Sequence, residues 1–312
     1  MYYENETELE LQGKVIPQNK PLDFDAFWRC AVEQVRNVPL QIRRKKLDTP
    51  YHKTVTSWEI SYNTHDDTWI DAYFSYPAGA EGKLPCVVYF HGGSGQKGLH
   101  LDIVATGVAC FAMDVRGQGG TSIDKAVYNS GCINGGLMTQ GIMDQNEFYM
   151  RNIFMDAIRA MDVVAQLEEV DPARIVTYGG SQGGALSLVA SAFSGHSQKA
   201  YIYVPSYSCL KQRTILGSRI FGSTHGYLKM FPEHADHVFT VLSYFDINNL
   251  ASFLTVPSVF CLGLADDVCL PHFVYSVYQH VPGPKEMHIY PFTPHCEPGL
   301  YRDMAHKAFS EM

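Results

Sequence analysis

The sequence of 312 residues has no hydrophobic run long enough to cross a membrane. Its longest apolar stretches, residues 84–90 and 257–264, have the length of a strand, whereas a membrane-spanning helix needs roughly 20 apolar residues. Residues 1–6 are acidic, and no apolar segment of signal-peptide length follows them. We therefore expect a soluble, cytoplasmic protein without a membrane partner.

Basic residues are in the minority. The 24 Lys and Arg residues stand against 32 Asp and Glu residues, which gives a formal net charge of -8. Because this excess repels the phosphate backbone of nucleic acids, we expect no nucleic-acid partner. One basic run, residues 43–46, is interpreted as a solvated surface stretch. The hydrophobic fraction of 46% is sufficient for a large core.

The sequence also lacks paired-cysteine and phosphate-binding motifs. Its eight cysteines include no Cys-x-x-Cys pair, so we interpret most of them as reduced and buried. Neither Gly-x-x-x-x-Gly-Lys-Ser/Thr nor Gly-x-Gly-x-x-Gly occurs, which argues against nucleotide binding. One set of possible metal ligands, His225, His234, Asp236 and His237, has no second cluster at a recognisable spacing. We expect neither a metal nor a cofactor.

The apolar pattern over most of the chain predicts an α/β fold. Continuous apolar runs, without the alternation of half-exposed strands, alternate with segments of helical periodicity. Strands that are apolar on both faces indicate a mostly parallel central sheet flanked by helices. The expected strands include residues 86–90, 109–113, 175–178, 201–204, 258–262 and 287–290, and the expected helices are 150–167, 185–193, 271–279 and 301–309.

Two further β-rich segments precede the parallel part. Residues 55–62 and 69–76 flank a polar turn and predict an antiparallel hairpin. A hairpin that leads into a parallel sheet is the order of the α/β-hydrolase fold. We treat residues 1–312 as a single domain of that fold.

Two segments stand outside the alternation. Residues 1–50 are expected to form a helical preface, in which Asp23 caps a helix that lays one apolar face on the main body. Residues 206–245 are rich in His, Gly and aromatic residues and are predicted to be a helical insertion. Because sites in such sheets lie at the carboxyl ends of the strands, this insertion would cover the active site.

The strongest motif is Gly-x-Ser-x-Gly at residues 179–183, between an apolar strand and an Ala-rich helix. This is the context of a nucleophile elbow, where the serine has a strained backbone and only small residues avoid a clash two positions to either side. Ser181 is therefore the candidate nucleophile. The N–H of Gln182, at the start of the helix, is a candidate donor to an oxyanion.

A serine hydroxyl needs a base to take its proton and a carboxylate to orient that base. Asp266 follows a buried strand, and we prefer it over its neighbour Asp267 as the acid. His295 lies in the loop after the last expected strand, just before the terminal helix, and is the candidate base. Most of the other histidines are interpreted as structural residues.

The second oxyanion donor is expected in the loop after the first parallel strand. There the sequence places Gly93, whose N–H is the candidate, two residues after His91. We interpret His91 as a residue that orders this loop rather than as a second base. Arg116 is assigned a supporting role, because a guanidinium after a strand can fasten neighbouring loops through several directed hydrogen bonds. Gln118 is placed with it as a supporting residue.

Several separate blocks of the sequence resemble the acetyl xylan esterase and cephalosporin C deacetylase family, over nearly the whole length. The blocks are residues 23–28, 114–119, 179–184, 242–246 and 263–271, and residues 283–286 leading to His295. The resemblance implies hydrolysis of acetyl esters of small sugar-like or cephalosporin-like alcohols. It assigns Ser181, Asp266 and His295 to the triad, and Gln182 and Gly93 to the oxyanion positions. It also implies a homo-oligomer, often a hexamer.

Two positions depart from the pattern of that family. Gly93 stands where the family usually carries Tyr, so an aromatic wall near the acyl group is missing. Cys296 separates His295 from the Glu that usually follows it directly. The residues leave two alternatives open: an α/β-hydrolase for a larger acyl ester or a peptide, and a non-catalytic binding protein of the same fold.

Overall fold

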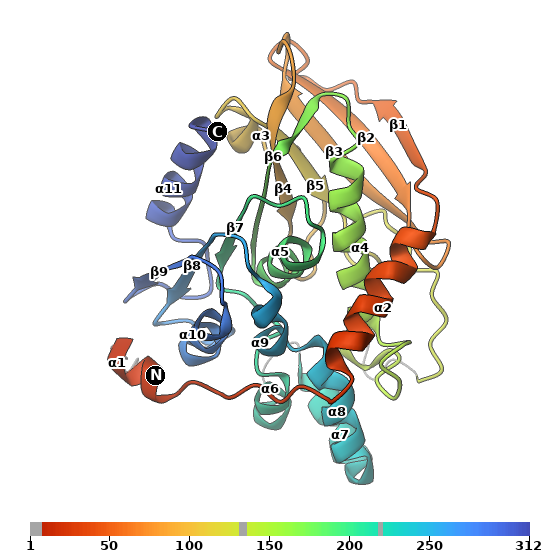
Figure 1. The fold of residues 1–312 in the computed structure, drawn as a ribbon, viewed down its shortest axis with the longest axis vertical. Helices are drawn as coiled ribbons and strands as arrows, with labels where there is room; N and C mark the ends of the chain where they lie inside the picture. Colours follow the sequence, from red (N-terminus) through yellow and green to blue (C-terminus); the bar gives the residue numbers. More distant parts are fainter. Residues whose placement is uncertain (1–7, 131–135, 218–220) are drawn as a thin grey trace.

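The computed structural model describes residues 8–130, 136–217 and 221–312. Within these residues one sheet of nine strands runs through the molecule, in the spatial order β1-β2-β3-β5-β4-β6-β7-β8-β9 (Figure 1). The strands are β1 (Ile42–Lys46), β2 (Val55–Asn63), β3 (Trp69–Pro77), β4 (Leu84–Phe90), β5 (Ala109–Met113), β6 (Val170–Gly180), β7 (Lys199–Tyr203), β8 (Ser258–Gly263) and β9 (Lys285–Tyr290).

The parallel part of the sheet extends from β5 to β9. Strand β4 pairs in parallel with both β5 and β6, and β6, β7, β8 and β9 continue the parallel ladder. Every residue of β5 and of β8 is buried, as expected for strands covered on both faces. The predicted mostly parallel sheet is confirmed.

The antiparallel part contains the predicted hairpin and one strand that was not predicted. Strands β2 and β3 pair from Val55 to Asn63, which confirms the hairpin, and β1 pairs with β2. The prediction of a helical preface is therefore wrong for residues 42–46. Their side chains are largely exposed, but the Arg43 guanidinium lies 3.5 Å from the ring centre of Trp69. A segment of basic residues can form an edge strand, because their side chains lie along aromatic rings while their charged groups face solvent.

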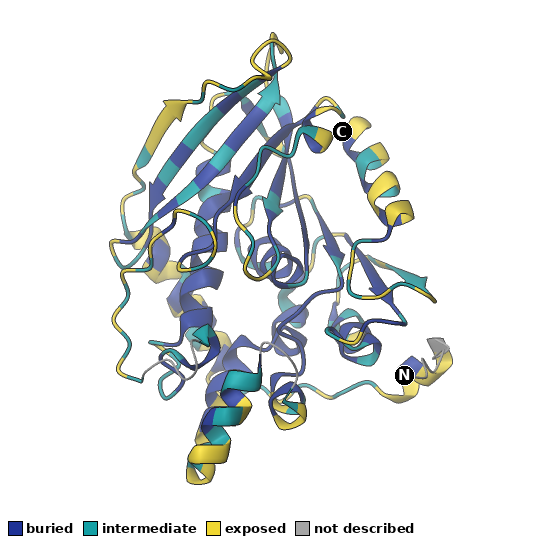
Figure 2. Cartoon of the chain, turned by 180° about the vertical axis from the view of Figure 1, so that it is seen from behind, coloured by how far each residue is buried: buried dark blue, intermediate teal, exposed yellow. Residues whose placement is uncertain are grey.

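Helices cover both faces of the sheet (Figure 1). One face packs against α2, α4, α5 and α10, and the other packs against α3 and α11. The central strands and α5 are mostly buried, whereas β1 is largely exposed and α11 exposes one side (Figure 2). These helices are α2 (Phe24–Asn37), α3 (Leu101–Val104), α4 (Tyr149–Val164), α5 (Gln182–Phe193), α10 (Pro271–His280) and α11 (Gly299–Ser310).

Short helices account for the expected insertion. Three α-helices between β7 and β8, together with a 3-10 turn, fill much of residues 206–245, as predicted, and they extend from the main body (Figure 1). They are α6 (Leu210–Leu216), α7 (Gly222–Met230), η3 (Pro232–His234) and α8 (Ala235–Phe245). The remaining helical elements are α1 (Glu8–Gly13), η1 (Leu137–Thr139), α9 (Ile247–Leu250) and η4 (Ala251–Phe253).

Helix α2 attaches to the main body through an aromatic contact. Trp28 is fully buried; its ring stacks on Phe193 at 5.3 Å, and its indole N–H donates to the carbonyl of Tyr244 at 2.8 Å. The predicted apolar face of this helix is confirmed. Asp23 occupies the N-cap position of α2, as predicted, but its side chain makes no capping hydrogen bond. Its carboxylate accepts a hydrogen bond from the Tyr244 hydroxyl instead.

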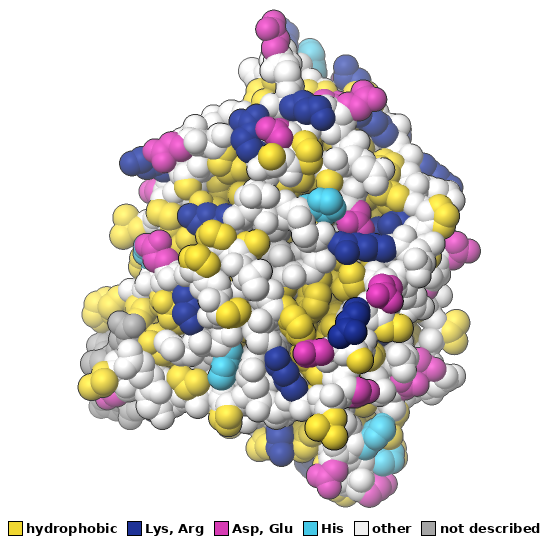
Figure 3. Space-filling model, in the orientation of Figure 1, with side chains coloured by type: hydrophobic (Ala, Val, Ile, Leu, Met, Phe, Trp, Pro, Cys, Tyr) yellow, Lys and Arg dark blue, Asp and Glu magenta, His cyan; other side chains and the backbone are white. Residues whose placement is uncertain are grey.

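The described surface carries charges of both signs. On the face shown in Figure 3, acidic and basic side chains are interspersed. Among the described helices, none combines the length and the apolar character needed to cross a membrane. Residues 1–6, on which the expectation about a signal peptide rests, lie outside the described residues.

Replacement of Trp28 by Ala should destabilise the protein. Removal of a fully buried Trp leaves a cavity and an unpaired carbonyl, so we expect the free energy of unfolding to fall by about 3–5 kcal/mol. Urea denaturation followed by circular dichroism measures this loss. The control is Leu22→Ala at an exposed position, which should change stability by less than about 0.5 kcal/mol. Equal losses in both variants would contradict the anchoring role of Trp28.

Candidate active site

Ser181 lies in the tight turn between β6 and α5. Its backbone has φ 54° and ψ -120°, a conformation that L residues rarely adopt. A side chain on Gly179 would collide with the carbonyl oxygen of Gly183, and a side chain on Gly183 would overlap the carbonyl oxygen of Phe90. The close approach of these backbones therefore requires glycine on both sides of Ser181, as a nucleophile elbow does.

The loop after β4 lies beside the elbow. A Cβ atom added to Gly92 would lie 3.9 Å from the Cβ of Ser181. Within the described residues, the backbone N–H groups of Gly93 and Gln182 donate no hydrogen bond. The N–H of Gln182 also stands at the amino end of α5, where the helix dipole favours negative charge. Both groups are thus available to an oxyanion at Ser181.

His295 and Asp266 form a hydrogen-bonded pair. The distance from His295 Nδ1 to Asp266 Oδ2 is 2.8 Å, and the second carboxylate oxygen accepts from the backbone N–H groups of Val268 and Cys269, each at 2.8 Å. The Asp266 side chain is 1% exposed, whereas that of His295 is 23% exposed. An Nδ1–H bond to Asp266 fixes the tautomer and leaves Nε2 of a neutral ring as the acceptor.

The neighbouring strands β8 and β9 bring this pair together. A side chain on Gly263, the last residue of β8, would overlap the carbonyl oxygen of Thr293. The same carbonyl accepts a hydrogen bond from Ala265 at 3.2 Å. The loop that carries His295 therefore lies directly against the loop that carries Asp266. The alternative acid, Asp267, is exposed.

The three candidate triad residues follow β6, β8 and β9 at one edge of the parallel sheet. Within the described residues no hydrogen bond joins the Ser181 hydroxyl to His295. Burial lowers the pKa of His295, but hydrogen bonds with Asp266 and Cys269 outweigh this effect and raise it above the usual range. Catalytic hydrogen bonds commonly tighten only when substrate is bound.

Cys269 is a member of this site that the sequence analysis missed. Its sulfur, the Asp266 carboxylate and the His295 ring present one ligand atom each, all within 4.8 Å of one another. Burial raises the pKa of the Cys269 thiol, but the Arg213 guanidinium and His295 lower it below the ordinary value. The signal in the sequence is its position three residues after Asp266, in a loop that turns back on that carboxylate.

The other cysteines fit the expectation of buried thiols in part. Of the seven that the structure describes, all have free thiols and five are buried, whereas Cys30 and Cys296 are exposed. Cys132 lies outside the described residues.

Gln118 connects the two candidate oxyanion segments. Its side-chain oxygen accepts from the backbone N–H of Ser94 at 3.0 Å, and its side-chain nitrogen donates to Gln182 Oε1 at 2.7 Å. Two tyrosine hydroxyls complete the network: Tyr149 accepts from Gln118 at 3.1 Å, and Tyr207 donates to Gln182 at 2.6 Å. These bonds fix the distance between the loop after β4 and the start of α5.

His91 orders the same loop from within. Its Nδ1 lies 2.7 Å from the carbonyl oxygen of Gly92, and its Nε2 lies 3.0 Å from the backbone N–H of Val115. Burial lowers the pKa of His91, which favours the neutral ring that this pair of bonds requires. These contacts agree with the structural role expected for His91.

Arg116 gathers three carboxylates from separate segments. It is fully buried and donates to Asp66 in the turn after β2, to Asp124 after β5 and to Asp156 on α4, at 2.5–3.3 Å. Although burial opposes the effect, Arg116 lowers the pKa of Asp66 to about 2. Burial raises the pKa of the enclosed Asp156 to about 6. The Tyr149 hydroxyl donates to the Arg116 carbonyl at 2.7 Å, which links this cluster to Gln118.

The metal-ligand candidates of the insertion do not come together. His225 bonds to the carbonyl of Thr214, His234 to the hydroxyl of Tyr227 and His237 to the carbonyl of Met143, at 2.8–3.0 Å. Each ring is thus directed to a different structural partner.

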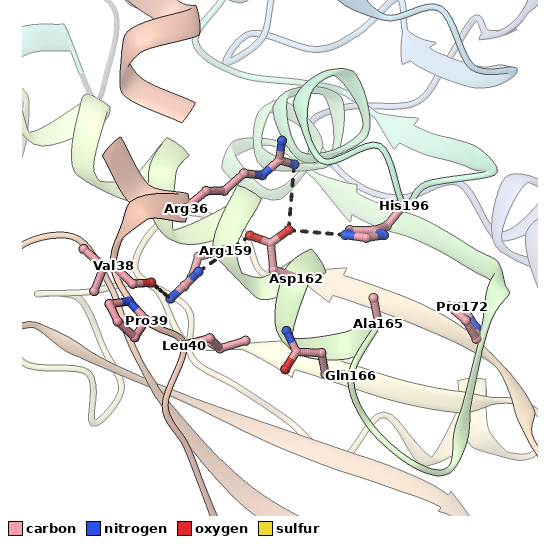
Figure 4. Close-up of a pocket in the computed structure, with 10 residues that line it drawn as sticks. All are labelled: Arg36, Val38, Pro39, Leu40, Arg159, Asp162, Ala165, Gln166, Pro172 and His196. Atoms are coloured by element: carbon pink, nitrogen blue, oxygen red, sulfur yellow. Dashed lines mark hydrogen bonds and ion pairs between the residues drawn. The ribbon is translucent and has the colours of Figure 1, made fainter. Parts of the chain in front are cut away.

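A cavity of about 500 Å³ lies away from the triad, between α2 and α4 (Figure 4). Its acid, Asp162, is already surrounded by the basic groups of Arg36, Arg159 and His196 at 3.3–3.9 Å. None of the candidate catalytic residues lines it. We assign the chemistry to the strand ends instead.

This fold and this site define an α/β-hydrolase that cleaves carboxylic esters. Residues 9–311 match the model of the acetyl xylan esterase (AXE1) family, and the chain belongs to that family. The resemblance and the fold predicted from the sequence are both confirmed.

Individual relatives agree with this assignment. The chain is similar to the acetyl xylan esterase from Paenibacillus sp. R4, at 32% identity and a TM-score of 0.92, over 98% of this chain and 99% of that one. It is similar to acetyl xylan esterase 1 from Thermoanaerobacterium sp. JW/SL YS485, at 30% identity and a TM-score of 0.91, over 98% of each chain. A curated relative, acetyl esterase Axe7A from Xylanibacter ruminicola, is 29% identical over 88% of this chain, which spans 63% of that protein.

Replacement of Gln118 by Ala should lower the turnover of an acetyl ester more than it changes KM. Without this side chain the loop of Ser94 and the side chain of Gln182 lose their common partner, and displaced oxyanion donors reduce kcat by about 10- to 100-fold. Steady-state kinetics at matched circular dichroism measure this effect. The matched control is Gln166→Ala at an exposed position. A kcat equal to that of wild type would exclude a positioning role.

Replacement of Arg116 by Ala should destabilise the protein by about 3–5 kcal/mol near neutral pH, because three carboxylates lose their cation. The pKa of Asp66 is about 2 in the folded protein, below its ordinary value of about 4. The stabilisation from this pairing is therefore complete above about pH 4 and is lost as the pH falls toward 2.

The stability difference between wild type and Arg116→Ala should accordingly shrink between about pH 7 and about pH 3. Urea denaturation at both pH values measures it. Arg302→Ala, at a half-exposed guanidinium, is the control and should have little effect at either pH. A difference that grows on acidification would contradict this assignment.

Proposed function

We propose that the chain is a serine esterase that removes acetyl groups from small acetylated xylo-oligosaccharides and from cephalosporin C-like esters. The observation that carries the proposal is the bond between His295 and Asp266 at the same sheet edge as the strained Ser181. Membership of the acetyl xylan esterase family supports the acetyl group as the acyl group that the enzyme removes. Acetylated xylan is named as the substrate class of two of the relatives above, and its extension to this chain is part of the proposal.

In the proposed mechanism His295 takes the proton of the Ser181 hydroxyl as the oxygen attacks the acetyl carbonyl. The negative charge on the carbonyl oxygen is held by the N–H groups of Gly93 and Gln182. His295 then gives its proton to the departing alcohol, which leaves an acetyl group on Ser181. A water molecule, deprotonated by His295, then attacks this ester; His295 returns the proton to the Ser181 oxygen as acetate is released. Asp266 stabilises the charged ring in both steps.

A second candidate function is hydrolysis of a larger acyl ester or of a peptide. The open space beside Gly93 favours it, since a Cβ there meets no atom within 4 Å. A peptidase shares the fold: the chain matches the acylaminoacyl peptidase of Pyrococcus horikoshii at a TM-score of 0.57, with 15% identity. A likeness at this identity supports the fold alone. A non-catalytic binding role is the weaker alternative because all three triad positions are filled.

The test compares acetyl, butyryl and octanoyl esters of one chromogenic alcohol, for wild type and Ser181→Ala. We expect fast hydrolysis of the acetyl ester, a decline with chain length, and a loss of at least about 1,000-fold in kcat in the variant. Circular dichroism establishes that the variant is folded. Faster hydrolysis of the longer esters would favour the second candidate. Equal rates in both proteins would refute the assignment of Ser181.

Assembly into a homo-oligomer and a cytoplasmic location remain predictions from the sequence. Size-exclusion chromatography with light scattering tests the first.

A further inference from the structure

The pair of Asp266 and His295 has a third partner whose chemistry the proposed reaction does not use. Cys269 is buried. Its sulfur, one Asp266 carboxylate oxygen and one His295 ring nitrogen lie within 4.8 Å of one another and are all potential metal ligands. Thiolate, imidazole and carboxylate are the three ligand types that Zn²⁺ prefers in proteins. Within the described residues this group alone brings three such ligands together.

We infer that Asp266, Cys269 and His295 form a binding site for a soft divalent cation such as Zn²⁺, and that a cation bound there inhibits the enzyme. The inhibition rests on the proposed function, whereas the binding does not. A cation bound there regulates or poisons the active site, because the proposed hydrolysis requires no metal.

The geometry needs little adjustment to hold such an ion. Ligands bound at about 2.0–2.3 Å from a tetrahedral zinc ion lie roughly 3.5 Å from one another. The three ligand atoms lie within 4.8 Å of one another, so no pair needs to close by more than about 1.3 Å. His295 is 23% exposed, which gives the ion a path into the site.

The carboxylate is already oriented for this purpose. One oxygen of Asp266 accepts two backbone N–H bonds, from Val268 and Cys269 at 2.8 Å, and the other oxygen faces His295 Nδ1. Hydrogen bonds to a ligand that fix its orientation increase the affinity of metal sites. Three protein ligands leave the fourth position of a tetrahedral ion to water.

The choice of ring nitrogen explains why binding inhibits. In the free enzyme Nδ1 carries a hydrogen that Asp266 accepts, and Nε2 is free to take the Ser181 proton. A cation bound at Nδ1 displaces that hydrogen, and the one N–H of the neutral ring moves to Nε2. The thiol proton of Cys269 passes to solvent. The ring then donates at Nε2 and can no longer act as the base for Ser181.

Direct binding of ZnCl₂ to the full chain tests the site. Isothermal titration calorimetry should detect one zinc ion per chain for wild type and for Ser181→Ala, since Ser181 contributes no ligand. Cys269→Ala should bind at least about 100-fold more weakly, because even the loss of an indirect partner costs 10- to 100-fold. Cys269→Ser, which keeps a polar side chain of similar size, should be weakened in the same way if Cys269→Ala does not fold.

The controls are Cys296→Ala and Cys30→Ala, which remove the exposed thiols among the described cysteines and should leave zinc affinity unchanged. Zinc should also inhibit hydrolysis of the acetyl ester by wild type, and a chelator should restore it. Unaltered affinity in both Cys269 variants, loss of binding in either control, or no binding by wild type would overturn the site.

Binding of zinc without inhibition would overturn the proposed effect on His295. A wild-type protein that binds zinc through Cys269 but hydrolyses none of the esters would instead support the site and refute the proposed function.

Discussion

The close approach of three backbone segments around Ser181 determines how the rest of the site is arranged. The end of β4, the end of β6 and the first turn of α5 meet with carbonyl oxygens where side chains would otherwise lie. Only glycine fits at positions 179 and 183. These two glycines allow the tight turn in which Ser181 has φ 54°. The same contact sets the loop of Gly93 beside α5, so that one constraint positions the candidate nucleophile and both candidate oxyanion donors.

The loops around this turn are held by buried charge and by amide side chains rather than by apolar contacts. Loops at the strand ends lack the regular hydrogen bonds of helices and strands, and their polar groups need specific partners when buried. Arg116 satisfies three carboxylates, and Gln118 joins two segments through four hydrogen bonds. Such networks lose much of their stabilising energy when one member is removed.

Much of the fold could be predicted because its signals are local. Continuous apolar runs gave β5 at its observed bounds, residues 109–113, and the bounds of the other parallel strands within about two residues, except that β6 already begins at Val170. The strand β1 could not be predicted in this way, because its residues form no apolar run. It pairs with β2, and its arginines lie on the rings of Trp58 and Trp69. Asp23 illustrates the same limit: a residue of the type that caps helices is directed instead to Tyr244, more than 200 residues away in the sequence.

In the candidate site, too, the residues in short sequence patterns were predicted, whereas those that depend on distant contacts were not. The elbow motif and the chain order of acid and histidine depend on short patterns, and the structure brings Asp266 and His295 into contact. Cys269 belongs to no recognisable sequence motif. Its place in the site depends on the loop that turns back on Asp266 and on His295, which follows β9. Tyr149 and Tyr207 were missed for the same reason.

At Gly93 the backbone donor to the oxyanion is present without a side chain that would wall the acyl pocket. In the proposed mechanism the oxyanion bond comes from its backbone N–H, so the absence of an aromatic side chain at this position leaves that donor in place. The acyl pocket, by contrast, is shaped by side chains, and the space beside Gly93 is open. Discrimination between acyl groups that differ by single methylenes amounts to only about 1–3 kcal/mol each. In the proposed mechanism hydrolysis therefore depends on the backbone geometry at Gly93, whereas preference for the acetyl group depends on the shape of the space beside it.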